Sequence, residues 1–215
     1  MNLLTAQDRL AAFRGGFPAV PLSARRIAGL LDAPGCVRRQ VVDAACVPID
    51  DLAALVGCPP AGQSPFALAR ARQFERLVTD NDMGPLLRLV RELLGLPVSA
   101  AREKDLSASQ VSMQFRRSDT AFRAELTRHY VREMLDGDDR AVNLLRSPIL
   151  ELAIGGVPMP VEPDAVAYAA TGPLHPVEIR SFPCVDGFAE PGQVSAAARQ
   201  TAVQGLATRE LVVRL

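Results

Sequence analysis

The sequence predicts a mixed α/β fold in which helices come first, three consecutive strands follow, and one helix closes the chain. Three observations support this prediction. Apolar residues recur at helical spacing as far as about residue 147. The next segments are short, rich in Val and Ile, and separated by Gly-Gly and Gly-Pro pairs, which is typical of strands. From Gln193 onward, alanine, arginine, leucine and glutamine dominate, and these residues favour helix.

Residues 1–63 form a predicted N-terminal helical region. A first helix is expected over residues 4–14, and the segment PLSARRIAGLLDAP predicts a second helix with Ser23 as its N-cap and Pro34 as its stop. The segment CVRRQVVDAACV continues as helix. The segment VGCPPAGQSP is then expected to be a loop.

Residues 64–215 form the predicted core, which begins at a helix marked by Ser64 and Pro65. A serine N-cap followed by proline at the first helical position is a strong start signal. The helical repeat places four side chains on one stripe: Leu68, Ala71, Glu75 and Val78. Glu75 therefore lies on a partly apolar face.

A helical insertion is predicted over residues 81–147. Helices are expected over 83–95 and 120–137, with a charged loop over 98–118 between them and a short helical turn over 138–146. Arginines recur along this insertion, at positions 116, 117, 123, 128 and 132. Because Asp119, Glu125 and Glu133 are interleaved with them, the sequence favours a solvated helix face over a phosphate-binding patch.

The three predicted strands are SPILELAIGG, VPMPVEPDAVAY and HPVEIRSF, arranged as a meander. A helix over about 193–211 follows them. The chain then reaches VVRL, where another strand could begin, so truncation after Leu215 is one interpretation.

Composition limits the function classes. The formal net charge is zero and the pI is about 6.7, so the chain as a whole has no positive field that would bind nucleic acid non-specifically. The N-terminus lacks the apolar region of a secretion signal, and no apolar run reaches the roughly 18 residues that a membrane span needs. A cytoplasmic location with reduced cysteines and no membrane partner is therefore expected.

The segment PVEIRSF carries the chemistry. In a strand, the period of two sends Glu178 and Arg180 to the same face, and Asp164 directly follows a proline at the start of the preceding strand. Adjacent strands can bring an Asp and a Glu close enough to share a divalent metal ion, which prefers carboxylate oxygens. A basic residue at Arg180 would then face the same cleft and could bind phosphate or stabilise developing charge.

These residues resemble the PD-(D/E)XK nuclease superfamily, in particular its RecB-like branch, which includes the CRISPR-associated RecB-like exonucleases. The resemblance covers residues 21–80 and 148–211, and the segment PLSARRIAGLLDAPGCVRRQ is also similar to that branch. It implies a restriction-endonuclease-like core of a helix, a three-stranded meander and a helix. The N-terminal helices and the insertion would be additions to that core.

The resemblance implies phosphodiester hydrolysis in DNA with Mg²⁺ or Mn²⁺. Asp164, Glu178 and Glu75 would be metal ligands, together with the carbonyl of Ile179, and Arg180 would stabilise charge on the phosphate. Two residues match the family's Q-x-x-x-Y motif beside the DNA, namely Gln200 and Gln204. By analogy with the branch, an exonuclease is expected, with a protein partner from a DNA-processing or defence system as a further possibility.

Three departures from the family pattern keep other interpretations open. Arg180 stands where the family has lysine, and Gln204 stands where it has tyrosine. Cys36 matches an early iron–sulfur ligand of the branch, but no later cysteines follow the last helix, so no intact cluster is expected. The alternatives are a catalytically degenerate nuclease fold that binds nucleic acid or scaffolds a partner, and an α/β protein with an accidental resemblance.

Overall fold

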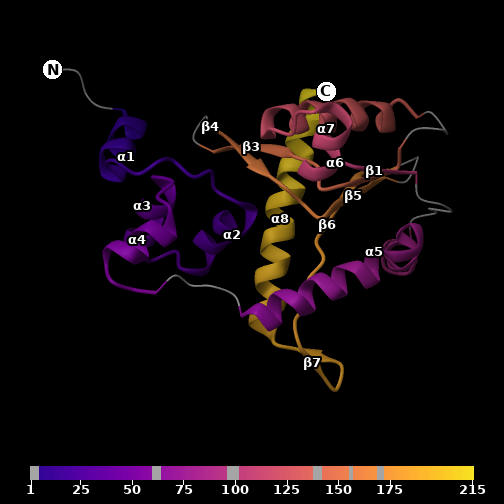
Figure 1. Cartoon of the computed structure of the whole chain (residues 1–215), viewed down its shortest axis with the longest axis horizontal. Coiled ribbons are helices and arrows are strands. Elements are labelled where there is room, and N and C mark those ends of the chain that lie inside the picture. The colour runs from indigo at the N-terminus through magenta and orange to yellow at the C-terminus, as the bar shows by residue number, and fades with distance from the viewer. Residues whose placement is uncertain (1–4, 60–63, 96–101, 138–141, 155–156, 169–171) are drawn as a thin grey trace.

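The computed structural model describes residues 5–59, 64–95, 102–137, 142–154, 157–168 and 172–215. The predicted α/β class is confirmed. Figure 1 shows α8 (Pro191–Arg214) running through the middle of the molecule, with the four-stranded main sheet on one side and the N-terminal helices on the other. None of the helices in the described ranges is both long and apolar enough to cross a membrane.

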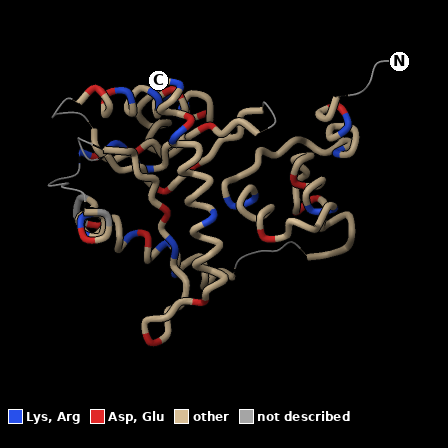
Figure 2. Tube along the Cα trace, turned by 180° about the vertical axis from the view of Figure 1, so that it is seen from behind, with Lys and Arg blue, Asp and Glu red and all other residues tan. Residues whose placement is uncertain are grey.

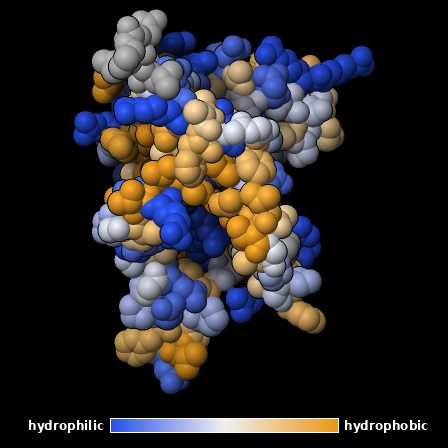
Figure 3. Space-filling model, turned by 90° about the vertical axis from the view of Figure 1, so that its left-hand side faces the viewer, coloured by the Kyte–Doolittle hydropathy of each residue, from blue (hydrophilic) through white to orange (hydrophobic). Residues whose placement is uncertain are grey.

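The N-terminal region contains four short helices: α1 (Ala6–Arg14), α2 (Ala24–Asp32), α3 (Val37–Ala44) and α4 (Ile49–Leu55). Ser23 caps α2 as predicted, because its Oγ accepts a hydrogen bond from the backbone N–H of Arg26 at 3.3 Å. Buried Ala24 and Ala28 place α2 in the main hydrophobic core, where it packs against α8. Hydrophobic side chains also gather across the middle of the outer face of this region (Figure 3).

Helix α5 (Pro65–Leu94) joins two helices that the sequence predicts separately, so the predicted interruption near residue 81 is wrong. The helix nevertheless changes direction, as its two halves in Figure 1 show. Met83 has a φ of 62° and Pro85 lies inside the helix, and proline removes a backbone hydrogen bond and bends a helix. Pro65 begins the helix as expected, although the side chain of Ser64 makes no capping hydrogen bond.

The main sheet has four strands in the order β1-β2-β5-β6. Their bounds are β1 (Glu103–Asp105), β2 (Leu144–Arg146), β5 (Ala165–Tyr168) and β6 (Leu174–Val177). Strands β1 and β2 are parallel, and the other pairs are antiparallel. The predicted loop over 98–118 is therefore wrong, since it contains β1 and α6 (Ala108–Phe115), and 144–146 is strand rather than a helical turn. The pairing of β2 with both β1 and β5 stabilises these short strands, and local sequence does not show it.

The predicted three-stranded meander is also wrong. Strands β3 (Leu150–Ile154) and β4 (Val157–Val161) pair only with each other among the described residues, and β5 belongs to the main sheet. The physical reason lies in Pro158 and Pro160 of β4, which have no N–H to donate and therefore confine β4 to the edge of a sheet. A further hairpin joins β7 (Cys184–Val185) to β8 (Phe188–Ala189).

Helices cover both faces of the main sheet. Leu145 and Val166 face the main core, to which α7 (Thr120–Leu135) and α8 contribute. Leu144 and Ala165 face the opposite way, into a second cluster formed with the last part of α5. Helix α8 also continues to Arg214, so the segment VVRL is helical up to its last residue and forms no strand.

Candidate functional site

Asp164 and Glu178 lie side by side at one end of the β5–β6 hairpin. The hairpin register pairs Ala165 with Val177, Asp164 directly precedes β5, and Glu178 directly follows β6. The backbone N–H of Ile179 donates a 2.6 Å hydrogen bond to Asp164 Oδ2 across the hairpin. The structure therefore brings together the two carboxylates that the sequence singles out, just beyond the paired strands.

Glu178 is held by three side chains. Gln200 Nε2 donates to Glu178 Oε1 at 2.9 Å, Gln204 Nε2 donates to Oε2, and Arg180 forms an ion pair with Oε1. The guanidinium of Arg180 also donates to Gln200 Oε1 at 2.6 Å. The Glu178 side chain is only 5% exposed, so this closed network replaces most of the water that a carboxylate would otherwise bind.

The two glutamines have different positions. Gln204 is fully buried and bonded to Glu178, so the predicted contact between Gln204 and nucleic acid is wrong. The reason is that α8 turns this position inward against the hairpin, where an amide can satisfy a buried carboxylate. Gln200, one turn earlier, is also mostly buried but lines the cavity beside the hairpin.

That cavity has a volume of about 750 Å³ and is bounded by α2, α3, α5, α8 and the segment after β6. Asp164, Glu75, Ile179 and Arg180 all line it. Glu75 is exposed on α5, and its charge is felt at Asp164. With Gln200, five of the predicted site residues therefore face one space, whereas Glu178 does not line it and bonds to α8 instead.

The surroundings make both hairpin carboxylates harder to ionise. Burial raises the pKa of Asp164 above its usual value, and the charges of Glu75 and Glu162 raise it further, against the lowering effects of Ile179 N–H and Arg180. Burial likewise raises the pKa of Glu178, and the charge of Asp164 adds to this effect. Carboxylates that share a poorly solvated space in this way are stabilised by a cation.

The residues present fit a hard divalent cation that is held in part by its substrate. Among the described residues, no three His, Cys, Asp or Glu side chains converge closely enough to hold a metal ion by themselves. However, Mg²⁺ is commonly bound by one or two carboxylates together with waters and substrate phosphates. Asp164 Oδ1 accepts no hydrogen bond from the described protein groups, and Asp164 lines the cavity together with Glu75, which supplies a second carboxylate.

Cys36 does not belong to this site. It precedes α3 as an exposed, free residue, and it does not line the cavity. The other three cysteines are also free, with Cys46 buried and Cys58 and Cys184 exposed.

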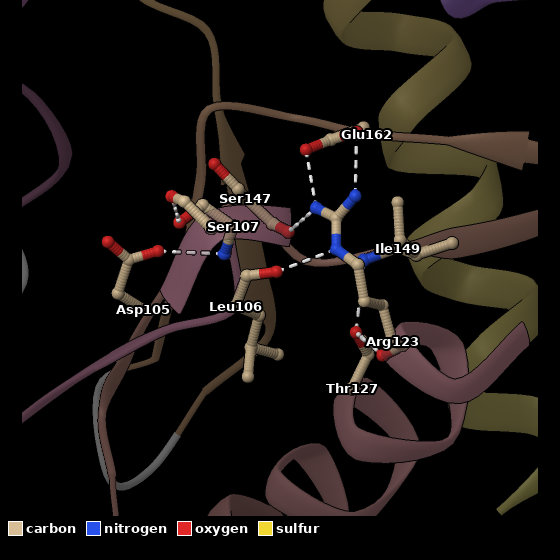
Figure 4. Close-up of polar contacts among 9 residues, drawn as sticks. Asp105, Leu106, Ser107, Arg123, Thr127, Ser147, Ile149 and Glu162 are labelled. Carbon is tan, nitrogen blue, oxygen red and sulfur yellow. Dashed lines mark hydrogen bonds and ion pairs between the residues drawn. The ribbon is translucent and has the colours of Figure 1, made fainter. Parts of the chain in front are cut away.

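Arg123 supports the site from behind and is buried, so the solvated helix face predicted for it is wrong. Its buried guanidinium donates to the carbonyls of Leu106 (2.7 Å) and Ser147 (2.8 Å) and pairs with Glu162 at 2.6 Å (Figure 4). Ser147 N–H in turn donates to the carbonyl of Asp164 at 3.0 Å. One sequence signal points inward, since Arg123 shares a helical stripe with apolar Val131 and Met134 through Thr127.

Comparisons of the chain with protein-family models, with curated proteins and with solved structures find no match.

Proposed function

We propose that this chain is a PD-(D/E)XK-type nuclease that hydrolyses phosphodiester bonds in DNA with Mg²⁺ or Mn²⁺. The observation that supports it best is the pairing of Asp164 with Glu178 across the β5–β6 hairpin, beside a cavity lined by several arginines. The resemblance to the RecB-like branch favours a restriction-endonuclease-like core and exonuclease action. A divalent cation bound there would supply Lewis-acid activation of a water molecule.

The residues of the chain have separate roles in this proposal. Asp164 and Glu75 provide carboxylate oxygens at the cavity surface, and the hydrogen bond from Ile179 N–H fixes the orientation of Asp164. Arg180 lines the cavity with a guanidinium that cannot act as a base but can stabilise charge on a phosphate. Glu178 positions Arg180 through their ion pair, and Gln200 fixes the pair from α8.

A second candidate function is DNA binding without cleavage. The saturation of Glu178 favours it, because both carboxylate oxygens already accept hydrogen bonds or an ion pair from Gln200, Gln204 and Arg180. A metal ion at Glu178 would have to displace at least one of these contacts. In this alternative the chain retains the nuclease fold, and Arg180 supplies the positive charge that a metal ion would otherwise supply.

Degradation of end-labelled single- and double-stranded DNA distinguishes the two candidates. The wild type should cleave with Mg²⁺ or Mn²⁺ but not with EDTA, and Asp164→Ala should lower the rate by at least about 10²-fold, more than the loss of an outer contact costs. Asp186→Ala, in the exposed β7–β8 turn, is the matched control and should cleave normally.

Arg180→Lys restores the residue that the family carries and is the deciding variant. Cleavage by Arg180→Lys but not by the wild type would support the non-catalytic candidate for the natural chain. If neither protein cleaves with either metal ion, the nuclease proposal is wrong.

A further inference from the structure

The lining of the cavity carries more basic than acidic side chains. Its arginines come from three helices and from the segment after β6: Arg25, Arg26, Arg39, Arg70 and Arg180. Its acidic side chains are Asp32, Glu75 and Asp164. Figure 2 shows basic residues at the start of α2 and alternating charges along the first half of α5.

Ion pairs account for part of this charge. Arg26 donates to Asp43 through Nε at 2.9 Å and through Nη2 at 2.5 Å, and it also reaches the carbonyl of Val47. Arg180 is paired with Glu178. The acid Asp32 is likewise neutralised by Arg199.

Three of the lining arginines are not neutralised by a close carboxylate among the described residues, so their positive charge can act on a ligand in the cavity. Arg25 of α2 and Arg70 of α5 are exposed and form no ion pair with any carboxylate in the part of the chain that the structure describes. Arg39 of α3 has only a long contact of 3.7 Å to Asp43, which Arg26 already engages. These three guanidinium groups face the same space as Asp164 and Glu75.

The shape of the cavity complements this charge. Small residues line it between the arginines, including Ala28 and Gly29 on α2 and Ala67 and Ala71 on α5. Gly29 is required for the position of Arg39, because a Cβ atom at Gly29 would lie 2.5 Å from Arg39 Nη2. A glycine inside a helix weakens the helix, so its presence here is consistent with a need for close approach.

We propose that helices α2 and α3 form a phosphate-binding wall, in which Arg25 and Arg39 contact phosphates on one side of Asp164 and Arg70 of α5 contacts a phosphate on the other. The N-terminal helical region is then part of the DNA site. The ligand is a DNA strand with several phosphates, not a single nucleotide. This inference rests on the proposed function, since it takes DNA as the occupant of the cavity.

Fluorescence anisotropy with a labelled single-stranded oligonucleotide in EDTA tests the wall without requiring hydrolysis. Arg25→Gln and Arg70→Gln should each raise Kd by about three- to tenfold at low salt, as expected for one lost charged contact. Each should also reduce the slope of log K against log salt concentration by about 0.7. Arg38→Gln and Arg72→Gln are the controls, because these exposed neighbours do not line the cavity, and they should leave Kd and the slope unchanged.

Gly29→Ala gives a second test that does not remove a charge. The added methyl group should displace the flexible end of Arg39 and weaken DNA binding severalfold while the thermal midpoint is maintained or raised. Gly205→Ala in α8, where a Cβ atom meets nothing within 4 Å, should leave binding unchanged.

The outcomes separate this inference from the proposed function. If the wild type never cleaves DNA and the cavity variants bind DNA more weakly than the wild type does, the results would support the wall and contradict the nuclease. Normal cleavage by the wild type, with cavity variants that bind no more weakly than their controls, would contradict the wall alone. Absence of oligonucleotide binding by the wild type at low salt would also overturn it, as would equal affinity for a single nucleotide.

Discussion

Asp164 combines three features at the scale of one residue: partial burial, neighbouring negative charges, and a hydrogen bond that fixes its orientation. The first two raise its pKa, and the third engages only one of its two carboxylate oxygens. The same features that suit a carboxylate to bind a cation therefore make it unfavourable for the stability of the free protein. The cost in stability can be measured by removing the charge of Asp164.

Asp164→Asn should raise the thermal midpoint at pH 7. Because the pKa is higher in the folded than in the unfolded chain, the native state binds a proton more tightly, and ionisation lowers the free energy of unfolding as pH rises above the usual value of 3.8. The amide removes this charge and can still accept from Ile179 N–H. Each gain of about 1 kcal/mol in the free energy of unfolding should raise the thermal midpoint by about 2–4 °C.

Thermal melts of the wild type and Asp164→Asn from pH 3 to pH 8 check this prediction, and the stabilisation should shrink as the pH falls toward the usual pKa of 3.8. Exposed Asp186→Asn should change the midpoint little at any of these pH values. A lower midpoint for Asp164→Asn at pH 7 would contradict the argument.

At the scale of elements, helix α7 is joined to the strands by a buried polar connection rather than by apolar contacts alone. Arg123 bonds to carbonyls of Leu106 and Ser147, and Thr127 Oγ1 accepts from Ile149 N–H at 3.0 Å while donating to the carbonyl of Arg123. One helical stripe thus satisfies backbone groups at the ends of several strands. The loop that precedes Asp164 is held through these bonds.

Arg123→Met should lower the free energy of unfolding by about 2–4 kcal/mol, because a buried carbonyl loses its donor and the contact with Glu162 is removed. Urea denaturation measures the change. Arg128→Met is the matched control on the same helix, since Arg128 pairs with Glu151 at the surface and its loss should cost about 0–1 kcal/mol. Equal losses in the two variants would show that the burial of Arg123 contributes nothing.

At the scale of the whole molecule, the helices of the N-terminal region differ in how closely they pack against the rest of the protein. Helix α2 contributes Ala24 and Ala28 to the main core and packs against α8, whereas α1 has no buried residue. Helix α2 also provides one side of the arginine-lined cavity. A site that spans α2, α5 and α8 depends on these helices remaining packed together.

Hydrogen exchange followed by mass spectrometry should show that amides of α2 and α8 exchange at similar slow rates through global unfolding. Amides of α1 should exchange much faster, because few contacts oppose local opening there. Exchange of α2 as fast as α1 would mean that α2 opens independently, and the cavity would then not be a preformed site.

The sequence alone determined the features that depend on neighbouring residues. Ser23 and Pro65 mark helix starts correctly because capping and the fixed φ of proline act locally. Val177 and Ile179 pack against the second core cluster, so Glu178 and Arg180 lie together as the period of two predicts, even though β6 ends at Val177.

Only the tertiary structure decided how distant segments combine. Strands β1 and β2 have three residues each and gain stability from pairing within the main sheet, a contact that hydrophobic periodicity does not reveal. The burial of Gln204 against Glu178 depends on how α8 packs on the hairpin, and the approach of Arg25 to the space beside Asp164 depends on how α2 packs on α8. Capping and strand alternation depend on neighbouring residues, whereas the partners of a buried carboxylate depend on which distant segments pack around it.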